Sequence, residues 1–137
     1  MVVYGSVARG DYRRDSDVDL VVVAEDLPRR RFARIELFER AEECLEKDLD
    51  MLMERGYFIS FSPIIKTPIE ASKISPLYLD MVEDSVILYD KNNFFESILD
   101  RLAKTLKNLG AERVRIGKKW YWRLKKDHKF GEVIVIE

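Results

Sequence analysis

The chain has 137 residues, the size of one ordinary domain, and 47% of them are hydrophobic, which is enough for one core. Its 24 Lys and Arg residues nearly balance 25 Asp and Glu residues, and a formal net charge of -1 gives no indication of a nucleic-acid partner for the whole molecule. Cys44 is the single cysteine, which excludes an intrachain disulfide. With no signal-peptide pattern and no apolar run near the roughly 20 residues of a membrane span, the sequence predicts a cytoplasmic protein.

The first stretch with a chemical signal lies near the start of the chain. Residues 2–4 read as a strand, and residues 17–23 read as a second strand after a short polar segment. Because side chains alternate between the two sides of a strand, Asp17 and Asp19 are expected on one side and the apolar residues between them on the other, in a core. Two carboxylates on one side of a strand start suit a phosphate that is held through a divalent metal.

The polar segment between these strands opens with Gly5 and Ser6. Gly5 permits close approach of the backbone, and Ser6 is expected to cap a short helix over residues 7–10. One interpretation is that this corner holds the triphosphate of a nucleotide; the other is a plain strand–turn–helix corner. Arg9 has two interpretations as well, a contact to phosphate or an ion pair with a nearby carboxylate.

A family resemblance rests on eight positions at fixed spacing. They are Gly5, Ser6, Arg9, Gly10, Ser16, Asp17, Asp19 and Leu20, in the pattern G-S-x-x-R-G followed by S-D-x-D-L. This pattern resembles the signature of the DNA polymerase beta-type nucleotidyltransferase superfamily, and the short chain is similar to the minimal nucleotidyltransferases of bacteria and archaea. The family usually has a helix before the first strand; its absence here indicates a truncated start, a wrongly assigned first Met, or a core face that a partner covers.

The resemblance implies roles for the residues of the pattern. Asp17 and Asp19 are expected to hold one or two Mg²⁺ (or Mn²⁺) ions as catalytic metal ligands. Gly5 and Ser6 are expected to hold the β and γ phosphates of ATP or another NTP, with Arg9 and Ser16 completing the nucleotide site.

Two other interpretations of the paired acids are less consistent with the sequence. Residues 15–19 resemble the opening of a calcium loop, but such a loop requires Gly at its sixth position and Glu at its twelfth, where this chain has Leu20 and Asp26. Two merely exposed acids at a strand end leave the apolar run that follows at once unexplained. Buried neighbours make such acids costly unless they coordinate something.

The middle of the chain predicts one long helix and a third strand. Residues 30–54 form the helix, which ends at Gly56. Its apolar face comprises Phe32, Ile35, Leu37, Phe38, Ala41, Leu45, Leu49 and Leu52. Residues 57–67 read as the strand, with Pro63 indicating an edge or a bulge. We therefore expect a small mixed sheet with helices on one face and the two acids on the open face.

The third strand departs from the family pattern. Active members commonly place a third acid there, which shares a metal or takes the proton from the attacking hydroxyl, but no acid occurs between Gly56 and Glu70. If Phe58, Ser60 and Ser62 share a side, one of the serines stands where the acid would be, and serine cannot serve as an anionic metal ligand and base. The remaining candidates are Asp50, Glu54, Glu70 and a residue of a partner.

The second half of the chain predicts a short turn at residues 67–70, a helix over 77–82 and a strand over 85–89 that joins the sheet. A long amphipathic helix over 94–109 follows and ends at Gly110. Beyond it we expect a basic, aromatic hairpin. Cations and aromatics there could stack on and neutralise single-stranded RNA or a nucleotide base. Alternatively, the hairpin is solvated and its tryptophans pack on the long helix. His128, the only histidine, reads as a surface residue.

These observations predict an α/β (α+β), nucleotidyltransferase-like fold with a small mixed β-sheet, helices on one face, and a C-terminal helix and β-hairpin. The expected parts are a nucleotidyltransferase-like domain over residues 1–90 and a C-terminal helix with a basic aromatic hairpin over residues 91–137, packed on that domain as one compact unit. By resemblance, the expected activity is transfer of an NMP, with AMP from ATP as the leading case, to a hydroxyl of a partner protein such as a HEPN-type toxin. The alternatives are a catalytically inactive nucleotide- or partner-binding domain of antitoxin type, and an RNA-binding module. A protein partner or a homo-oligomer is expected.

Overall fold

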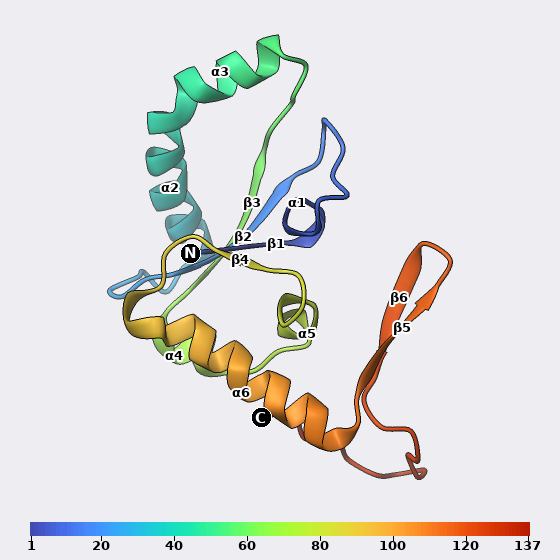
Figure 1. Ribbon diagram of the computed structural model, residues 1–137. Helices are drawn as coiled ribbons and strands as arrows, with labels where there is room; N and C mark the ends of the chain where they lie inside the picture. The colour runs from blue at the N-terminus through green and yellow to red at the C-terminus, as the bar shows by residue number, and fades with distance from the viewer.

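The computed structural model describes all residues from Met1 to Glu137 (Figure 1). In chain order the elements are β1 (Val2–Tyr4), α1 (Gly5–Arg9), β2 (Val18–Val23), α2 (Arg31–Glu42), the 3-10 helix η1 (Glu43–Leu45), α3 (Glu46–Glu54), β3 (Phe61–Lys66), α4 (Pro68–Ser72), α5 (Leu77–Met81), β4 (Val86–Ile87), η2 (Lys91–Asn93), α6 (Phe94–Leu109), β5 (Glu112–Ile116) and β6 (Lys119–Arg123).

The predicted mixed sheet is confirmed. Its strand order is β3-β2-β1-β4, in which β2 and β3 are parallel while β1 is antiparallel to both β2 and β4. The strand predicted over residues 85–89 therefore joins the sheet, as the short β4. The predicted C-terminal hairpin is also present, as a separate two-stranded sheet of β5 and β6.

The hydrophobic core lies between the sheet and the helices α5 and α6, which lie below the sheet in Figure 1. Helix α6 has the predicted bounds, ends at Gly110 in the left-handed conformation, and buries the stripe Phe95, Ile98, Leu99, Leu102 and Leu106. These side chains pack with Val2 and Val21 of the two central strands. Each fully buried side chain of this kind stabilises the fold by about 1.5–3 kcal/mol. One core thus includes residues on both sides of position 90.

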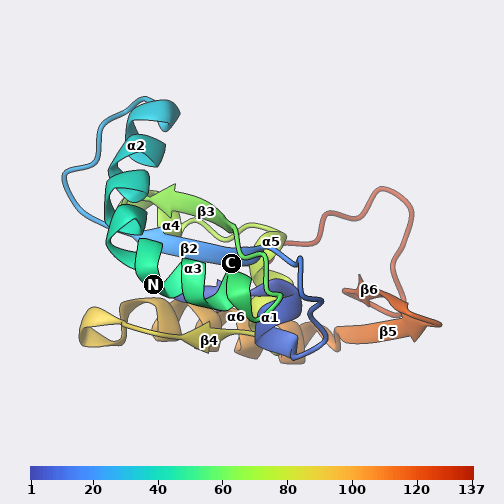
Figure 2. The ribbon, with the colours of Figure 1, turned by 90° about the horizontal axis from the view of Figure 1, so that it is seen from above.

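The expectation that helices lie on one face holds for α5 and α6 but not for α2. The Phe38 ring of α2 meets the Phe61 ring edge to face, with centroids 6.0 Å apart. Phe61 pairs with Val18, so it lies on the side of the sheet opposite to Val21. Figure 2 shows α2 and α6 on opposite sides of β2. Leu20 and Val21 point to opposite sides of the sheet, and both are consequently buried. Asp17 and Asp19 lie on the same side as Val21. The side that carries the two acids is therefore not an open face along its whole length, in contrast to the open face that the sequence predicted.

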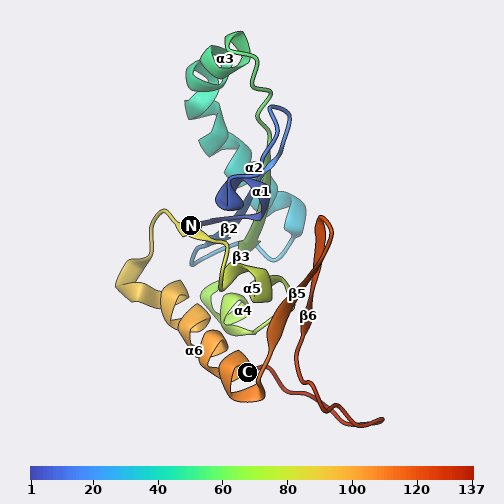
Figure 3. The same cartoon turned by 45° about the vertical axis from the view of Figure 1, so that its right-hand side comes forward.

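The single helix predicted over residues 30–54 is divided in the structure. The 3-10 turn η1 separates α2 from α3, and none of the three elements contains a buried residue. Figure 3 shows this arm leading away from the α4–α6 layer. The predicted apolar face therefore contributes no buried residue to the core. Phe38 meets the sheet, but the face is not covered along its length, so packing does not hold the segment to one straight axis. None of the helices in the molecule has the length and apolarity needed to cross a membrane.

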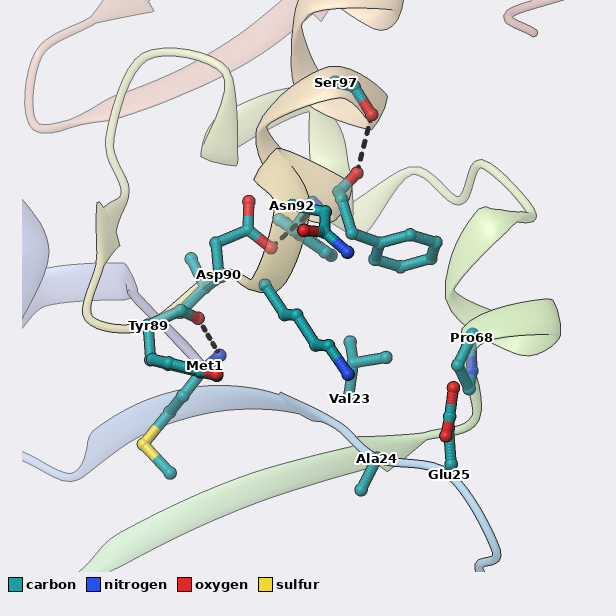
Figure 4. A pocket seen from close by; sticks show the side chains of 13 residues that line it. Met1, Val23, Ala24, Glu25, Pro68, Tyr89, Asp90, Asn92 and Ser97 are labelled. Atoms are coloured by element: carbon teal, nitrogen blue, oxygen red, sulfur yellow. Dashed lines mark hydrogen bonds between the residues drawn. The ribbon is translucent and has the colours of Figure 1, made fainter.

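A pocket of about 700 Å³ lies at the far end of β2 from the acids. Met1, Val23, Tyr89 and Asp90 are among its lining residues (Figure 4). The Met1 ammonium group donates to the Tyr89 carbonyl over 2.7 Å, and burial lowers the pKa of that amine. Because none of the predicted site residues lines it, this pocket is separate from the candidate active site.

Candidate active site

Gly5 marks the corner between β1 and α1. Its φ is +73°, and a Cβ at this position would overlap Asp19 Oδ2 far inside van der Waals contact. Only glycine combines this torsion with so close an approach. The sequence motif therefore has a direct geometric reason: the missing side chain of Gly5 leaves the space that the Asp19 carboxylate occupies.

The predicted capping role of Ser6 is wrong. Helix α1 begins at Gly5, its N-cap position is Tyr4, and no side chain caps it. The chain turns at Gly5, before Ser6, so Ser6 lies within the helix. Its carbonyl accepts hydrogen bonds from the amides of Gly10 and Asp11, over 3.0 and 3.2 Å.

The two acids lie side by side at the start of β2. Asp17 directly precedes the strand, and Asp19 pairs with Tyr4 on one side and Ser62 on the other. Burial, and then the charge of Asp17, raise the pKa of the Asp19 carboxyl, while Arg9 opposes the shift. Burial and the charge of Asp19 also raise the pKa of Tyr4. The site therefore concentrates negative charge that a cation would offset.

Arg9 takes the local ion pair that was one of its two interpretations. Its Nε lies 3.3 Å from Asp11 Oδ2. Its guanidinium carbon also lies 4.6 Å from the ring centroid of Trp120, in strand β6 of the hairpin. The side chain is 22% exposed, so its charge is still accessible to a phosphate at the β1–α1 corner.

Ser16 closes the turn that leads into β2. Its Oγ accepts a hydrogen bond of 2.8 Å from the Arg13 amide, and its own amide donates to the Arg13 carbonyl over 3.2 Å. The neighbouring Arg14 carbonyl accepts from the Phe58 amide over 2.8 Å. These bonds join the polar loop to the segment before β3 and so set where Asp17 enters the strand.

Ser60 lies beside Asp17, where the sequence pattern placed a serine in the position of the third acid. Its hydroxyl donates a hydrogen bond of 2.6 Å to Asp17 Oδ1. Ser62, two residues further on, is the register partner of Asp19 and is exposed. The condition that the two serines share the side of the acids is met.

The other candidates for a third acid do not join the pair. Glu70 is bound by Arg34 over 2.7 Å, beyond the far end of β3. The six residues of that strand span roughly 20 Å. Asp50 and Glu54 are exposed on α3. No group of three His, Cys, Asp or Glu side chains is close enough to hold a metal ion.

The hairpin contacts α5 and α1. The indole N–H groups of Trp120 and Trp122 both donate to Asp80 Oδ1 of α5, over 3.2 and 2.9 Å. Arg113 lies 4.5 Å from the Trp120 ring centroid and pairs with Asp84 over 2.6 Å. The tryptophans therefore do not pack on the long helix alone, as the non-functional interpretation expected. The cation–π contact between Trp120 and Arg9 was not predicted from the sequence, although the interleaved aromatic and basic residues of the hairpin are a pattern that favours such contacts.

Several hairpin and tail cations are paired with local acids. Arg123 and Lys126 both bind Glu112, over 2.6 and 3.3 Å. Lys125 binds Glu132 in the following segment. These pairs neutralise part of the basic patch, which weakens the case for an RNA-binding surface.

The residues present fit a divalent cation with hard ligands. Mg²⁺ binds through one or two carboxylates together with substrate phosphates and water, so two acids suffice when a nucleotide supplies further oxygens. Asp17 offers a second oxygen, Oδ2, besides the one that Ser60 binds. Burial raises the pKa of Asp19 most and the charge of Asp17 raises it further, and a bound cation would offset the repulsion between the two carboxylates.

Comparison with known proteins assigns the family. The model of the family described as "Nucleotidyltransferase domain" matches residues 1–116. The chain therefore belongs to the nucleotidyltransferase domain family, and transfer of nucleotidyl groups is the activity class of that family.

Two known proteins show more particular similarities. A Methanocaldococcus jannaschii protein named "Putative protein adenylyltransferase" is 31% identical over 122 residues, which cover 88% of this chain and 78% of that protein. A chain of the solved structure described as "Crystal structure of the toxin-antitoxin with AMP-PNP" is 19% identical, with a TM-score of 0.47, over 79% of this chain and 73% of that chain.

Proposed function

We propose that this protein transfers AMP from ATP to a hydroxyl group of a protein. The observation that carries the proposal is the pair of acids at the start of β2. Glycine is the only residue type at position 5 that leaves room for the Asp19 carboxylate. The 31% identical relative named as a protein adenylyltransferase supports both the nucleotide and the class of acceptor.

In this proposal, Asp17 and Asp19 are the ligands of one or two Mg²⁺ ions. When bound, the metal supplies charge neutralisation at the phosphates and orients the triphosphate for in-line displacement of pyrophosphate. The Gly5–Ser6 backbone approaches the β and γ phosphates, and Arg9 neutralises part of their charge. Ser16 acts through the loop bonds that place Asp17, rather than by direct contact.

The proposed acceptor is a partner protein, with a HEPN-type toxin as the leading case from the family resemblance. The arm formed by α2, η1 and α3 suits a partner, because it leads away from the core layer and has no buried residue. Its exposed apolar side chains include Phe32 (83% exposed) and Met53 (53% exposed). A second copy of the chain is the other partner that this surface would accept.

A second candidate function is nucleotide binding without transfer. It is favoured by one observation, the absence of a third carboxylate beside Asp17 and Asp19. In that case the protein binds Mg²⁺-ATP but releases no pyrophosphate, even with its partner present.

Calorimetric titration of Mg²⁺-ATP tests the proposed site. The Asp17→Asn, Asp19→Asn double variant should bind at least about 100-fold more weakly than the unmodified chain, a loss of about 2.8 kcal/mol. The reason is that both carboxylates that offset the metal charge are removed. The same titration without Mg²⁺ should show a comparable loss.

The matched control is the Asp26→Asn, Asp127→Asn variant, which removes the same charge from exposed positions away from the pair. It should bind like the unmodified chain. Equal affinity for all three proteins would place the nucleotide elsewhere. Binding without pyrophosphate release in the presence of the partner would select the second candidate function.

A further inference from the structure

The position that lacks a third acid holds a nucleophile. Ser60 is exposed, directly precedes β3, and its hydroxyl donates a 2.6 Å hydrogen bond to Asp17 Oδ1. A carboxylate within hydrogen-bond reach of a hydroxyl is the arrangement that prepares this group for attack. Of the two serines on this side of the sheet, only Ser60 has such a bond.

The backbone holds Ser60 in this place. The Val18 amide donates to the Ser60 carbonyl over 2.8 Å, which extends the β2–β3 pairing by one residue beyond the strand. The Phe58 amide donates to the Arg14 carbonyl over 2.8 Å, just ahead of it. Ser60 is thus fixed on both sides to the segment that carries Asp17, so the contact is a feature of the sheet and not of a free loop.

We propose that Ser60 is an acceptor of the AMP group, so that the protein adenylylates itself at this residue. This inference rests on the proposed function, because the triphosphate must lie at Asp17 and Asp19. A hydroxyl bonded to Asp17 then lies on the same side of the sheet as the α-phosphorus and needs no partner to bring it there.

The step balances with a nucleoside triphosphate as the sole co-reactant. The Ser60 O–H bond breaks and its proton passes to Asp17 Oδ1. The bond from Ser60 Oγ to the α-phosphorus forms as the bond from that phosphorus to the bridging oxygen breaks. Pyrophosphate leaves with that electron pair, and the products are an AMP ester of Ser60 and free pyrophosphate.

The product would block the site that made it. An AMP ester at Ser60 removes the hydrogen bond to Asp17 and places a phosphodiester beside both carboxylates. The modified chain is expected to lose its affinity for further Mg²⁺-ATP, which limits the reaction to one AMP per chain. The modification would therefore also be a switch, in which the unmodified chain alone is free to act on a partner.

The test is incubation of the full chain with Mg²⁺-ATP, followed by intact mass measurement and peptide mapping. We expect one added AMP on the peptide that contains Ser60, and no addition in the Ser60→Ala variant or in the Asp17→Asn, Asp19→Asn variant. Ser60→Thr retains a hydroxyl and should restore the addition. Ser62→Ala, two residues along the same side, should leave it unchanged.

Calorimetry on the same samples separates the two proposals. Metal-dependent binding of ATP by the unmodified chain with no AMP on Ser60, or an addition that persists in Ser60→Ala, overturns self-adenylylation and leaves the proposed function standing. No binding of Mg²⁺-ATP at all overturns both. Loss of binding in the fraction that carries AMP is the expected second readout, and full binding by that fraction overturns the switch.

Discussion

At the scale of single residues, the contact between Gly5 and Asp19 carries the site. The chain reverses at a positive φ, and the space of the absent side chain is taken by a carboxylate on the neighbouring strand. The same carboxylate has a raised pKa because it is partly buried and lies close to Asp17. The backbone conformation at Gly5 and the charge of Asp17 therefore both act on the Asp19 carboxylate. For this reason we expect a substitution of Gly5 to disturb the site, as a substitution of the acids does.

A Gly5→Ala variant tests this contact. The new Cβ would displace Asp19, and the left-handed torsion would cost about 1–2 kcal/mol of unfolding free energy. We expect a folded protein whose affinity for Mg²⁺-ATP falls at least about tenfold, or about 1.4 kcal/mol, by calorimetry. Gly131→Ala is the control, since Gly131 also has a positive φ, of +81°, but meets no atom within 4 Å. Unchanged affinity in Gly5→Ala would show that Asp19 does not hold the nucleotide.

At the scale of elements, the hairpin is linked to helix α1. The Trp120 ring contacts two guanidinium groups, with its centroid 4.6 Å from that of Arg9 and 4.5 Å from that of Arg113. Its indole nitrogen is held by Asp80 of α5. The hairpin is thus fixed to α5 and presents an aromatic face to the motif that contains Arg9, so an element near the end of the chain supports a residue near its start.

Removing this aromatic face should weaken nucleotide binding. In Trp120→Ala, Arg9 loses a cation–π contact worth about 0.5–2 kcal/mol, and we expect a roughly three- to tenfold rise in the dissociation constant of Mg²⁺-ATP. Trp120→Phe should recover most of the affinity because it keeps a ring. Tyr121→Ala, at the neighbouring and 48% exposed position of β6, should have no effect. If all three variants bind Mg²⁺-ATP with the affinity of the unmodified chain, the hairpin does not position Arg9.

At the scale of the whole molecule, one ion pair ties several elements together. Arg34 of α2 binds Glu70 of α4 and also donates to the carbonyls of Pro28 and Ile65, over 2.6 and 3.1 Å. Glu70 in turn accepts from the Thr67 amide in a capping box. The pair therefore connects the α2 arm to the end of β3 and the start of the α4–α6 layer.

The pH dependence of unfolding reports on this pair. The hydrogen bond from Arg34, followed by that from the Thr67 amide, lowers the pKa of Glu70 from 4.5 to about 2. A depressed folded-state pKa contributes stability that is complete above the unfolded value and is lost as the pH falls toward the folded value. We expect Glu70→Gln to be less stable than the unmodified chain at pH 7. The difference should shrink between pH 4.5 and about 2.

Urea unfolding of both proteins across that range measures the effect. Glu39→Gln, which changes an exposed glutamate of α2, is the control and should follow the unmodified chain at every pH. A Glu70→Gln midpoint that stays below the unmodified midpoint by the same amount at all pH values would mean that charge is not the source of the stabilisation.

Local pattern was sufficient where a segment's own residues decide its conformation. Helix α6 has its predicted bounds because the apolar stripe repeats at helical spacing and Gly110 ends it. The sequence likewise predicted that Asp17 and Asp19 share a side and that the strand before α6 joins the sheet. These features depend on the alternation of side chains, on glycine at chain reversals and on the spacing of the motif.

Only the tertiary structure decided which surfaces are covered and which distant groups meet. The apolar residues of the α2–α3 segment follow a helical period, and Phe38 meets the sheet, yet none of them is buried, so the helix divides and most of its face stays uncovered. Helices on both sides of β2, the bond from Ser60 to Asp17, and the stacking of Trp120 on Arg9 all join residues far apart in the chain. Periodicity reports what one segment prefers, whereas burial and long-range contact depend on where every other segment lies.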